Sequence, residues 1–397
     1  MSRDETMRRP THVLLLCESL AQTGGVERFV CELADALVVR GMKVTLGSVD
    51  TPRERLAYPV DGRVAVVAAA TSPSALSAPR TRPGRRLAIL RERLRTARAL
   101  GRVIDATGAD TIVLNGLVTA CSVLAWKSSA RRRSICCDHN HFAARSAIWQ
   151  RLRARLYPQV GAVVSLTEAD RSKFAALNPR TRVILNTSSL HADAPALPAA
   201  PGALAVGRHQ AQKGFDLLLR AWQQVQARMP EARLRIVGGG PLGAELEALA
   251  EELGVSASVE WAGPTDLIEP LYREAAVFVL SSRYEGMPLA LLEAQALGVP
   301  AVAFDCPTGP REILTPETGV LVPAEDVPGL ASALLRLLGD PALRAHMGAA
   351  AIERSRTAFG RERQMSAWAT LIEKVAESVE IATARPVAAR TRGSRRR

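Results

Sequence analysis

Aromatic residues are scarce in this sequence: Phe, Trp and Tyr make up 4% of its 397 residues. A large surface that stacks nucleic-acid bases is therefore not expected. The six cysteines include no C-x-x-C pair and no zinc spacing, so they give no sign of a disulfide framework. This usage favours a reducing, cytoplasmic compartment.

Long apolar runs are also missing. The charged N-terminus MSRDETMRRP contains no signal-peptide core. The longest apolar stretch, Thr111–Trp126, is interrupted by Asn115 and Thr119 and is shorter than the ~20 residues of a membrane-spanning helix. We therefore expect a protein that is soluble or attached to a membrane surface.

Positive charge is present in excess, and it is unevenly distributed. The first 190 residues carry 30 Lys and Arg against 15 Asp and Glu, whereas residues 191–384 carry 16 against 24. The last thirteen residues add six Arg and no acid. A basic half followed by an acidic half indicates two domains with different partners.

The first half alternates strand and helix patterns. The apolar run Thr11–Cys17 is followed by a loop with Gly24 and Gly25, a helical period over 26–41 and a strand at Lys43–Val49. Such a βαβ unit builds parallel sheets. Further buried strands are expected at Val64–Ala68, Thr111–Leu114, Arg133–Cys137 and Ala162–Leu166. An exposed loop is expected at Thr71–Arg86 and a basic helix at Leu87–Ile104.

The second half repeats this pattern. A strand at Ala203–Val206 leads into a glycine-containing loop and a helix over Phe215–Arg228. The Pro- and Ala-rich stretch 191–202 is the expected linker between domains 1–190 and 203–360. Two doubly wound α/β domains follow, with ligands at the carboxyl ends of the strands. The later strands are expected at Leu234–Val237, Val259–Trp261, Val277–Leu280 and Ala301–Phe304.

The most informative segment is Ser281–Pro300, SSRYEGMPLALLEAQALGVP. Glu285 lies in a loop before an expected helix, for which Pro288 suits the first position, and Glu293 falls on the apolar stripe of that helix. A buried carboxylate without a partner costs several kcal/mol. The partner is either a ligand with hydroxyl donors or an internal salt bridge, and the sequence leaves both open.

A second segment, AVGRHQAQKGFD at 205–216, places Arg208 and Lys213 on one loop after a strand. Arg offers forked donors to phosphate oxygens and Lys offers a point charge. A merely solvated loop is the alternative, but two cations stand out in an otherwise acidic half. No D-x-D motif occurs in the sequence to hold a divalent ion, so we expect no metal and no other cofactor.

A third segment, CCDHNHF at 136–142, follows an expected strand. A lone His is more often structural, but two His and an Asp at the carboxyl end of a strand point to the cleft. His139 is the first candidate and His141 the second.

In combination, these segments resemble the retaining glycosyltransferases of family 4, which have the GT-B architecture of two Rossmann-like domains facing each other across a cleft. The resemblance extends over residues 11–375 and includes Glu285-x7-Glu293, the GR…KG loop, the early TGG at 23–25 and IVGGGP at 236–241. The segment FDCPTGPREI at 304–313 is similar to members that use UDP-hexoses or UDP-N-acetylhexosamines.

The resemblance implies a role for each of these positions. Arg208 and Lys213 would hold the donor diphosphate. Glu285 and His139 would contact the donor sugar, and these four residues would form the catalytic set. Glu293 would accept from the ribose hydroxyls. The other substrate-binding positions would be Gly24, Gly25, Gly239, Gly263, Gly286, Met287, Pro288 and Leu289.

The expected function is sugar transfer from a nucleotide diphosphate donor to a glycan or lipid-linked acceptor, in cell-surface polysaccharide or glycolipid synthesis. The N-terminal domain would bind the acceptor, helix 361–384 would return to that domain, and the tail 385–397 is expected to be disordered. Two alternatives are a basic nucleic-acid-binding protein, which lacks any recognisable binding motif here, and an epimerase on the same fold. The pattern of cleft carboxylates typical of such epimerases is not found.

The basic helix indicates where the protein meets the acceptor. Leu87, Leu90, Leu94 and Ala97 share one face among its arginines, as in helices that lie on anionic membranes. The alternative is that this face packs on its own domain, and the sequence leaves the two equal. The first would place the protein on the inner face of the plasma membrane. The arginines concerned are Arg85, Arg86, Arg91, Arg93, Arg95, Arg98 and Arg102, with Arg131–Arg133.

Overall fold

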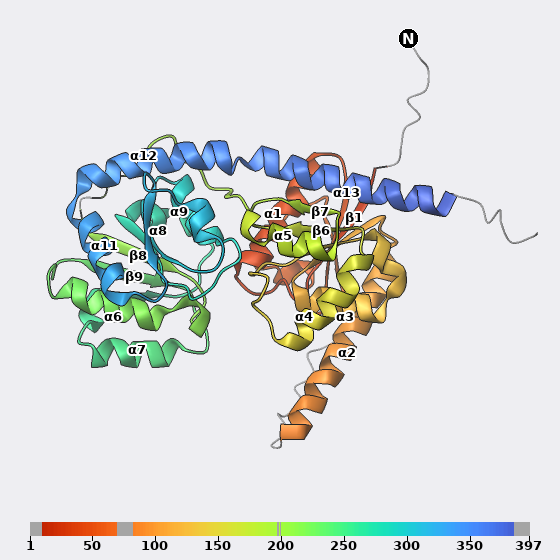
Figure 1. Ribbon diagram of the computed structural model, residues 1–397, viewed down its shortest axis with the longest axis horizontal. Coiled ribbons are helices and arrows are strands. Elements are labelled where there is room, and N and C mark those ends of the chain that lie inside the picture. The colour runs from red at the N-terminus through yellow and green to blue at the C-terminus, as the bar shows by residue number, and fades with distance from the viewer. Residues whose placement is uncertain (1–9, 70–81, 197, 199, 385–397) are drawn as a thin grey trace, which may run out of the picture.

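The computed structural model describes residues 10–69, 82–196, 198 and 200–384 of the chain. They form two α/β domains that lie side by side, the N-terminal domain on the right and the C-terminal domain on the left in Figure 1. The expected tail at 385–397 and most of the expected loop at 71–86 fall outside the described residues.

The N-terminal domain is built on a seven-stranded parallel sheet in the described residues, with strand order β3-β2-β1-β4-β5-β6-β7. Central strands such as β1 are buried at every position, as expected for a sheet covered on both faces. The strands are β1 His12–Leu16, β2 Lys43–Ser48, β3 Ala65–Ala68, β4 Thr111–Asn115, β5 Ser134–Cys137, β6 Ala162–Ser165 and β7 Thr181–Val183. The helices are α1 Gly25–Val39, α2 Arg82–Thr107, α3 Leu117–Trp126, α4 Ala147–Leu156 and α5 Glu168–Leu177.

The C-terminal domain holds a parallel sheet of six described strands in the order β10-β9-β8-β11-β12-β13. Its strands are β8 Gly202–Val206, β9 Arg233–Val237, β10 Val259–Ala262, β11 Val277–Leu280, β12 Ala301–Asp305 and β13 Gly319–Pro323. Its helices are α6 Phe215–Gln226, α7 Gly243–Glu252, α8 Glu269–Glu274, α9 Leu289–Ala296, α10 Pro310–Ile313 and α11 Val327–Gly339.

In both sheets the order of the strands reverses at the corresponding place. The chain starts in the middle of the sheet, at β1 or β8, and adds strands toward one edge. It then continues on the other side of the first strand, at β4 or β11. This order is that of a Rossmann-like, doubly wound fold, so the predicted fold class is confirmed. In such folds the ligand lies at the strand ends beside the reversal, which is where the loops after β1, β8 and β11 emerge.

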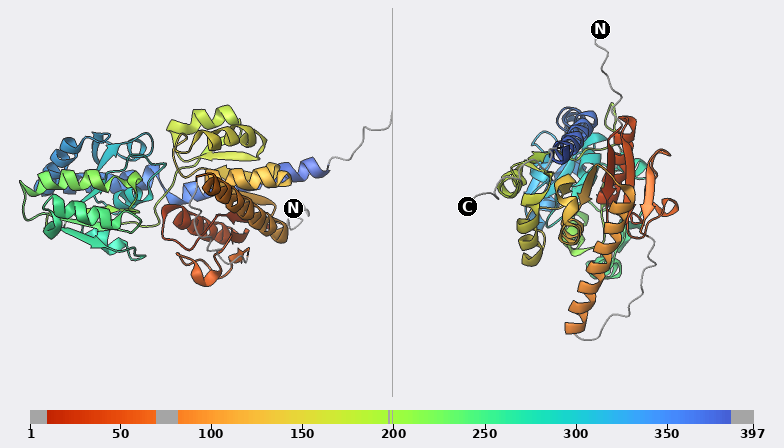
Figure 2. Two further views of the ribbon diagram at one scale, coloured as in Figure 1. Left: turned by 90° about the horizontal axis from the view of Figure 1, so that it is seen from below. Right: turned by 90° about the vertical axis from the view of Figure 1, so that its right-hand side faces the viewer.

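Two long helices connect the domains along one side of the molecule (Figures 1 and 2). α12, Pro341–Ala358, packs its Gly348 against Gly298 of the C-terminal domain. α13, Arg361–Ala384, accepts a hydrogen bond at the carbonyl of Ile372 from Thr111 of β4, 3.2 Å long. The chain therefore crosses between the domains a second time at the break between α12 and α13.

The structure differs from the sequence expectations in several places. α2 begins at Arg82, so residues 82–86 are helical rather than part of a loop. Pro83 is compatible with this because it stands in the first turn, where a missing N–H costs nothing. The short strands β7 and β13 were not expected, since runs of three to five residues give little pattern to detect.

Candidate functional site

The loop after β8 brings the two predicted cations to the strand ends of the C-terminal sheet. Gly214 has a φ of 62° and its Cα lies against the carbonyl of Ser281, so a side chain there would clash with backbone. This close approach sets Lys213 beside the loop after β11. The Nζ of Lys213 donates to Oε1 of Glu285 at 2.7 Å.

Glu285 is buried, with 6% of its surface exposed, and one of its carboxylate oxygens, Oε1, accepts two hydrogen bonds. Besides Lys213, the hydroxyl of Ser282 donates to Oε1 at 2.6 Å. Thr308 donates to the Glu285 backbone carbonyl at 2.6 Å, so the segment at 304–313 fixes this loop. Predicted residues Lys213 and Glu285 are therefore in direct contact.

The residues after Glu285 connect this loop to the N-terminal domain. A Cβ on Gly286 would lie 2.8 Å from the carbonyl of His139, so the two loops touch at their backbones. Met287 is buried, and its carbonyl accepts from the Asn186 side chain at 3.0 Å. Pro288 is the residue before α9, one position earlier than expected. The first residue of α9, Leu289, lies 3.5 Å from the Cβ position of Gly25.

Arg208 crosses the cleft to the N-terminal domain. Its guanidinium donates to Glu27 of α1 at 3.3 Å and lies against Gly24, where a Cβ would clash with it. The Arg208 side chain is 41% exposed, so this ion pair is in reach of solvent. Gly24 and Gly25 thus face the C-terminal loops, and because glycine has no side chain these loops can approach their backbone closely.

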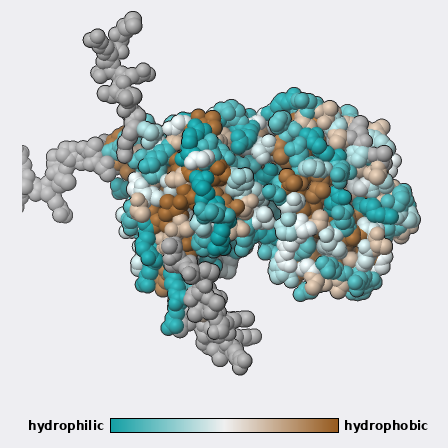
Figure 3. Space-filling view, turned by 180° about the vertical axis from the view of Figure 1, so that it is seen from behind, coloured by the Kyte–Doolittle hydropathy of each residue, from teal (hydrophilic) through white to brown (hydrophobic). Residues whose placement is uncertain are grey.

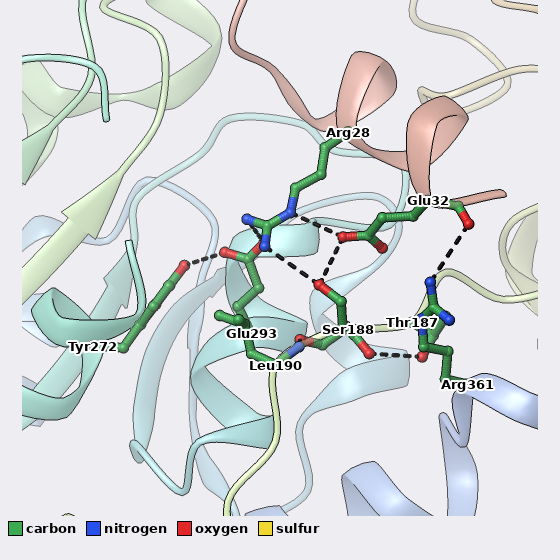
Figure 4. A network of polar contacts seen from close by, with 9 residues as sticks. Arg28, Glu32, Thr187, Ser188, Leu190, Tyr272, Glu293 and Arg361 are labelled. Atoms are coloured by element: carbon green, nitrogen blue, oxygen red, sulfur yellow. Dashed lines mark hydrogen bonds and ion pairs between the residues drawn. The ribbon is translucent and has the colours of Figure 1, made fainter. Parts of the chain in front are cut away.

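Glu293 lies on α9 and is 5% exposed. Its Oε1 is 2.8 Å from Nη1 of Arg28 in α1, and its Oε2 accepts from the hydroxyl of Tyr272 in α8 at 2.9 Å. Figure 4 shows these side chains converging from the two domains. Burial raises the pKa of Glu293, while the Arg28 charge and the Tyr272 hydroxyl oppose that rise. A salt bridge, one of the two partners left open by the sequence, is therefore present.

His139 follows β5 and is held by Asn115 at the end of β4. The Asn115 Nδ2 donates to the carbonyls of Leu16 and Val113 at 3.3 and 3.5 Å, which leaves Oδ1 to face the histidine. Nε2 of His139 therefore donates to Oδ1 at 2.9 Å, and Nδ1 is the free acceptor. Burial lowers the pKa of His139 to about 4, so the ring is neutral at physiological pH.

His141 lies in the same loop but takes a different position. Its ring meets the Tyr284 ring edge-on at 5.5 Å, across the domain boundary. His139 instead packs on Phe29 of α1 at 5.0 Å. The structure thus separates the two histidine candidates: one contacts α1 and Asn115, and the other contacts the loop after β11.

A buried ion pair supports the loop that carries both histidines. Arg153 of α4, 1% exposed, contacts Asp138 at 3.1 Å and donates to the Phe142 carbonyl at 2.7 Å. Tyr157 donates to the other Asp138 oxygen at 2.5 Å. Because each of these groups has a partner within the domain, the loop at 138–142 is fixed at both ends.

Gly239 and Gly263, two of the predicted substrate-binding positions, lie in a separate part of the site. A Cβ on Gly239 would lie 3.7 Å from Pro264, so the loops after β9 and β10 are adjacent, whereas Gly263 faces open space. The amide of His209 donates to the Gly239 carbonyl at 2.9 Å. This bond links the loop to the one that carries Arg208.

Arg28, Asn115 and Arg153 were not identified from the sequence. Arg28 stands three residues after Gly25, in TGGVER, and this proximity was the available signal. Asn115 interrupts an apolar strand at its carboxyl end, which is a second signal. Arg153 lies among other arginines on α4, and nothing in the sequence distinguishes it.

In the part of the chain that the structure describes, His, Cys, Asp and Glu nowhere form a group of three or more that could hold a metal ion. The described cations of the site are instead paired with single carboxylates, Lys213 with Glu285 and Arg208 with Glu27. An anionic ligand that enters between the glycines of α1 and the loop after β8 meets both cations.

Two family models match the chain. The model described as Glycosyltransferase Family 4 matches residues 23–187, and the model described as Glycosyl transferases group 1 matches residues 200–340. The chain is also 30% identical over 367 residues to the amylovoran biosynthesis glycosyltransferase AmsD of Erwinia amylovora. That alignment covers 90% of this chain and 98% of the relative.

Solved structures are similar along nearly the whole chain. Sucrose-phosphate synthase from Thermosynechococcus elongatus has a TM-score of 0.78 and 22% identity, covering 93% of this chain and 100% of that one. S. aureus TarM, solved with UDP bound, has a TM-score of 0.75 and 13% identity, covering 91% and 99%. At these identities the two structures show a common fold.

Proposed function

Because the chain belongs to glycosyltransferase family 4, we propose that it is a retaining enzyme that transfers a hexose or N-acetylhexosamine from a UDP-linked donor. The acceptor is a hydroxyl of a glycan or lipid-linked intermediate. Family membership rests on the two matching family models and on a relative similar over almost its full length. The chain is a glycosyltransferase, and this membership supports a role in polysaccharide or glycolipid synthesis.

The observation that carries the donor site is the position of Lys213 and Arg208. Both lie on one loop at the reversal point of the C-terminal sheet, and both are paired with carboxylates that a diphosphate can replace. Lys213 is 20% exposed and Glu285 8% exposed, so their contact is poorly solvated and its charges interact strongly.

In the proposed reaction the bond between the sugar and the diphosphate breaks, and negative charge grows on the leaving phosphate. Lys213 and Arg208 stabilise that charge, each well-placed donor contributing about 3–4 kcal/mol. The Glu285 carboxylate accepts from hydroxyls of the donor sugar. The neutral His139 offers Nδ1 as a further acceptor, since Asn115 holds its Nε2 proton.

Retention follows from attack on the face that the leaving group departs from. The leaving phosphate takes the proton of the acceptor hydroxyl, the acceptor oxygen bonds to the anomeric carbon, and the nucleoside diphosphate is released. In this scheme the two fixed cations supply the charge that a divalent ion supplies in other sugar-nucleotide enzymes. We therefore propose that the reaction is independent of metal.

We further propose that the protein acts in the cytoplasm, attached to the inner face of the plasma membrane through α2. Leu90 and Leu94 are 57% and 41% exposed, beside the exposed Arg91 and Arg95. The right-hand view in Figure 2 shows α2 projecting beyond the rest of the N-terminal domain, and its surface is largely hydrophilic in Figure 3. Ala97, nearer the sheet, is buried against the domain. Among the described residues, no helix is both long and apolar enough to cross a bilayer.

The experiment that tests the proposed function is turnover of a panel of UDP- and GDP-linked sugars by the full chain. Release of the nucleotide is followed with and without lipid-linked acceptors, and with EDTA present. We expect turnover with a UDP-hexose or UDP-N-acetylhexosamine, unchanged by EDTA, and a product whose anomeric configuration, read from NMR coupling constants, matches that of the donor. An inverted product, or loss of turnover in EDTA, would contradict the corresponding part of the proposal.

A thermal-shift measurement separates this function from nucleic-acid binding. UDP is expected to raise the melting temperature of the protein because it binds only the folded state. Duplex DNA is expected to produce no shift that persists at high salt, since contacts to phosphates alone are released by salt. A salt-resistant shift with DNA and none with UDP would favour the alternative.

A further inference from the structure

Arg28 connects the two domains at the predicted ribose site. It lies on α1 and belongs to the N-terminal domain, while its partner Glu293 belongs to the C-terminal domain. Their side chains are 18% and 7% exposed, and the Nη1–Oε1 distance is 2.8 Å. Because this ion pair is largely shielded from solvent, removal of either partner would leave the other charge buried and unpaired.

The remaining groups of the Arg28 guanidinium are also engaged. Nε donates to Glu32 at 3.0 Å, and Nη2 donates at 3.4 Å to Ser189 in the connecting segment. Ser189 in turn donates to Glu32 at 2.7 Å. Figure 4 shows Arg28 held between Glu32 and Glu293, so the arginine cannot swing freely between partners.

The Glu293 carboxylate has capacity left for a ligand. An ionised carboxylate accepts at about four lone-pair positions, of which Arg28 and Tyr272 use one on each oxygen. A vicinal diol, which donates two hydrogen bonds to one carboxylate, matches the remaining capacity. Glu285 and Glu293 are eight residues apart, with about 6 Å of helix between the start of α9 and Glu293. The two carboxylates can therefore contact different parts of one elongated donor, the sugar and the ribose.

Arg28 also determines whether a ligand meets Glu293 as a carboxylate or as a protonated carboxyl. Burial favours the protonated carboxyl, which has lost an acceptor position, and the Arg28 charge favours the carboxylate. In return, Glu293 and Glu32 raise the pKa of Arg28 although burial lowers it. The two side chains therefore keep each other charged.

We propose that Arg28 is a positioning residue for the donor ribose, holding the Glu293 carboxylate ionised and oriented toward the ribose hydroxyls when the two domains are together. The inference rests on the proposed function, together with the ribose contact that the family resemblance implies for Glu293. It adds that the N-terminal domain controls recognition of the nucleoside through this arginine. A purely structural clamp would instead affect all nucleotide ligands equally.

The experiment measures how strongly the ribose 3′-hydroxyl contributes to binding. Dissociation constants of UDP, GDP and their 3′-deoxy analogues are determined by calorimetry for the full chain, for Arg28→Met and for Arg28→Lys. The wild type is expected to bind the better nucleotide about tenfold or more tightly than its 3′-deoxy form, as for a hydrogen bond to a charged group. Arg28→Met is expected to reduce this preference to within about twofold, and Arg28→Lys to keep more of it than Arg28→Met, because lysine retains the charge.

Arg40→Met is the matched control. Arg40 also lies at α1 and forms an ion pair, with Glu362 at 2.6 Å, but on the N-terminal domain's own side. This variant is expected to keep the wild-type ribose preference. If Arg28→Met does not fold, Arg28→Gln replaces it, since its shorter side chain removes the charge and stays polar; the expected loss of preference is at least threefold.

The possible results distinguish the assignment of Glu293 to the ribose from the role of Arg28. Equal affinity of the wild type for a nucleotide and its 3′-deoxy form, or no binding of either nucleotide, would reject the ribose assignment within the proposed function. A wild-type preference that Arg28→Met retains would overturn the role of Arg28 alone. Equal weakening of both ligands in this variant would show that Arg28 is a clamp.

Discussion

The C-terminal domain carries its functional groups in two loops, whereas the N-terminal domain contributes single residues from several strand ends. Arg208 and Lys213 are five residues apart, and Glu285 belongs to a continuous motif with Gly286 and Met287. On the other side, Gly24, Asn115 and His139 follow β1, β4 and β5, and they meet only in the folded sheet.

The difference has a physical reason. In the proposed function the C-terminal domain binds a diphosphate, a small and highly charged group that one loop can surround. The N-terminal domain would form the opposite wall, through close backbone approach and oriented single side chains. The uneven charge agrees with this division, since Arg208 and Lys213 are cations of the acidic half and the excess of positive charge lies in the basic half.

The largest effect is expected in the C-terminal domain. Lys213→Ala and Glu285→Ala should each lower kcat at least a hundredfold, because they remove a charge partner from a poorly solvated site. Turnover of the purified variants with the preferred donor measures this. The fold should survive, which far-UV circular dichroism checks.

Arg235→Ala is the control for these variants. Arg235 lies on β9 of the same domain, and both of its ion pairs, with Glu260 and Glu274, lie outside the two loops. Its loss should leave kcat within a factor of two, as for exposed ion pairs. Near-normal turnover of Lys213→Ala or Glu285→Ala would contradict the assignment of the donor site to these loops of the C-terminal domain.

The second effect concerns the surface of the N-terminal domain. Reversing Arg91, Arg95 and Arg102 on α2 to Glu should weaken binding to anionic vesicles at least tenfold, since each basic residue near such a surface contributes about 1 kcal/mol. All three side chains are exposed. Co-sedimentation with vesicles that contain or lack phosphatidylglycerol measures the difference, and donor turnover in solution should not change. Equal sedimentation of wild type and variant would leave α2 without a membrane role.

The sequence was sufficient for the fold and for the C-terminal loops. Continuous apolar runs located most strands, because parallel strands are buried on both faces, and period-3.6 patterns located most of the expected helices. It was insufficient where a partner comes from another element. Glu293 visibly needed a partner, but nothing along the chain connects it to Arg28, which is more than 260 residues away. The same holds for Asn115 and His139, which are neighbours only because β4 pairs with β5.

The third prediction uses the pH dependence of stability to test His139, a half-buried histidine of the N-terminal domain. Burial lowers the pKa of folded His139 to about 4 from an ordinary 6.5, so the unfolded chain binds the extra proton between these values. Stability contributed by the neutral ring is present above about pH 6.5 and is lost as the pH falls toward 4. The melting temperature should change more steeply with pH across this range for the wild type than for His139→Gln. Identical slopes would show that the pKa of His139 is the same in the folded and the unfolded chain.

The smallest effect is expected at the contact between Glu27 and Arg208, where Glu27 of the N-terminal domain would compete with a donor phosphate for the guanidinium. Glu27 occupies the guanidinium that a donor phosphate requires, so Glu27→Gln should tighten UDP binding. Because Arg208 is 41% exposed, the contact contributes only about 0.5–1 kcal/mol, which corresponds to two- to fivefold in affinity. Calorimetry with UDP measures this, with Glu362→Gln as the control, since Glu362 pairs with Arg40 at the opposite end of α1. Weaker binding in Glu27→Gln would mean that the N-terminal carboxylate orients Arg208 for the phosphate, and that the two domains cooperate at this cation.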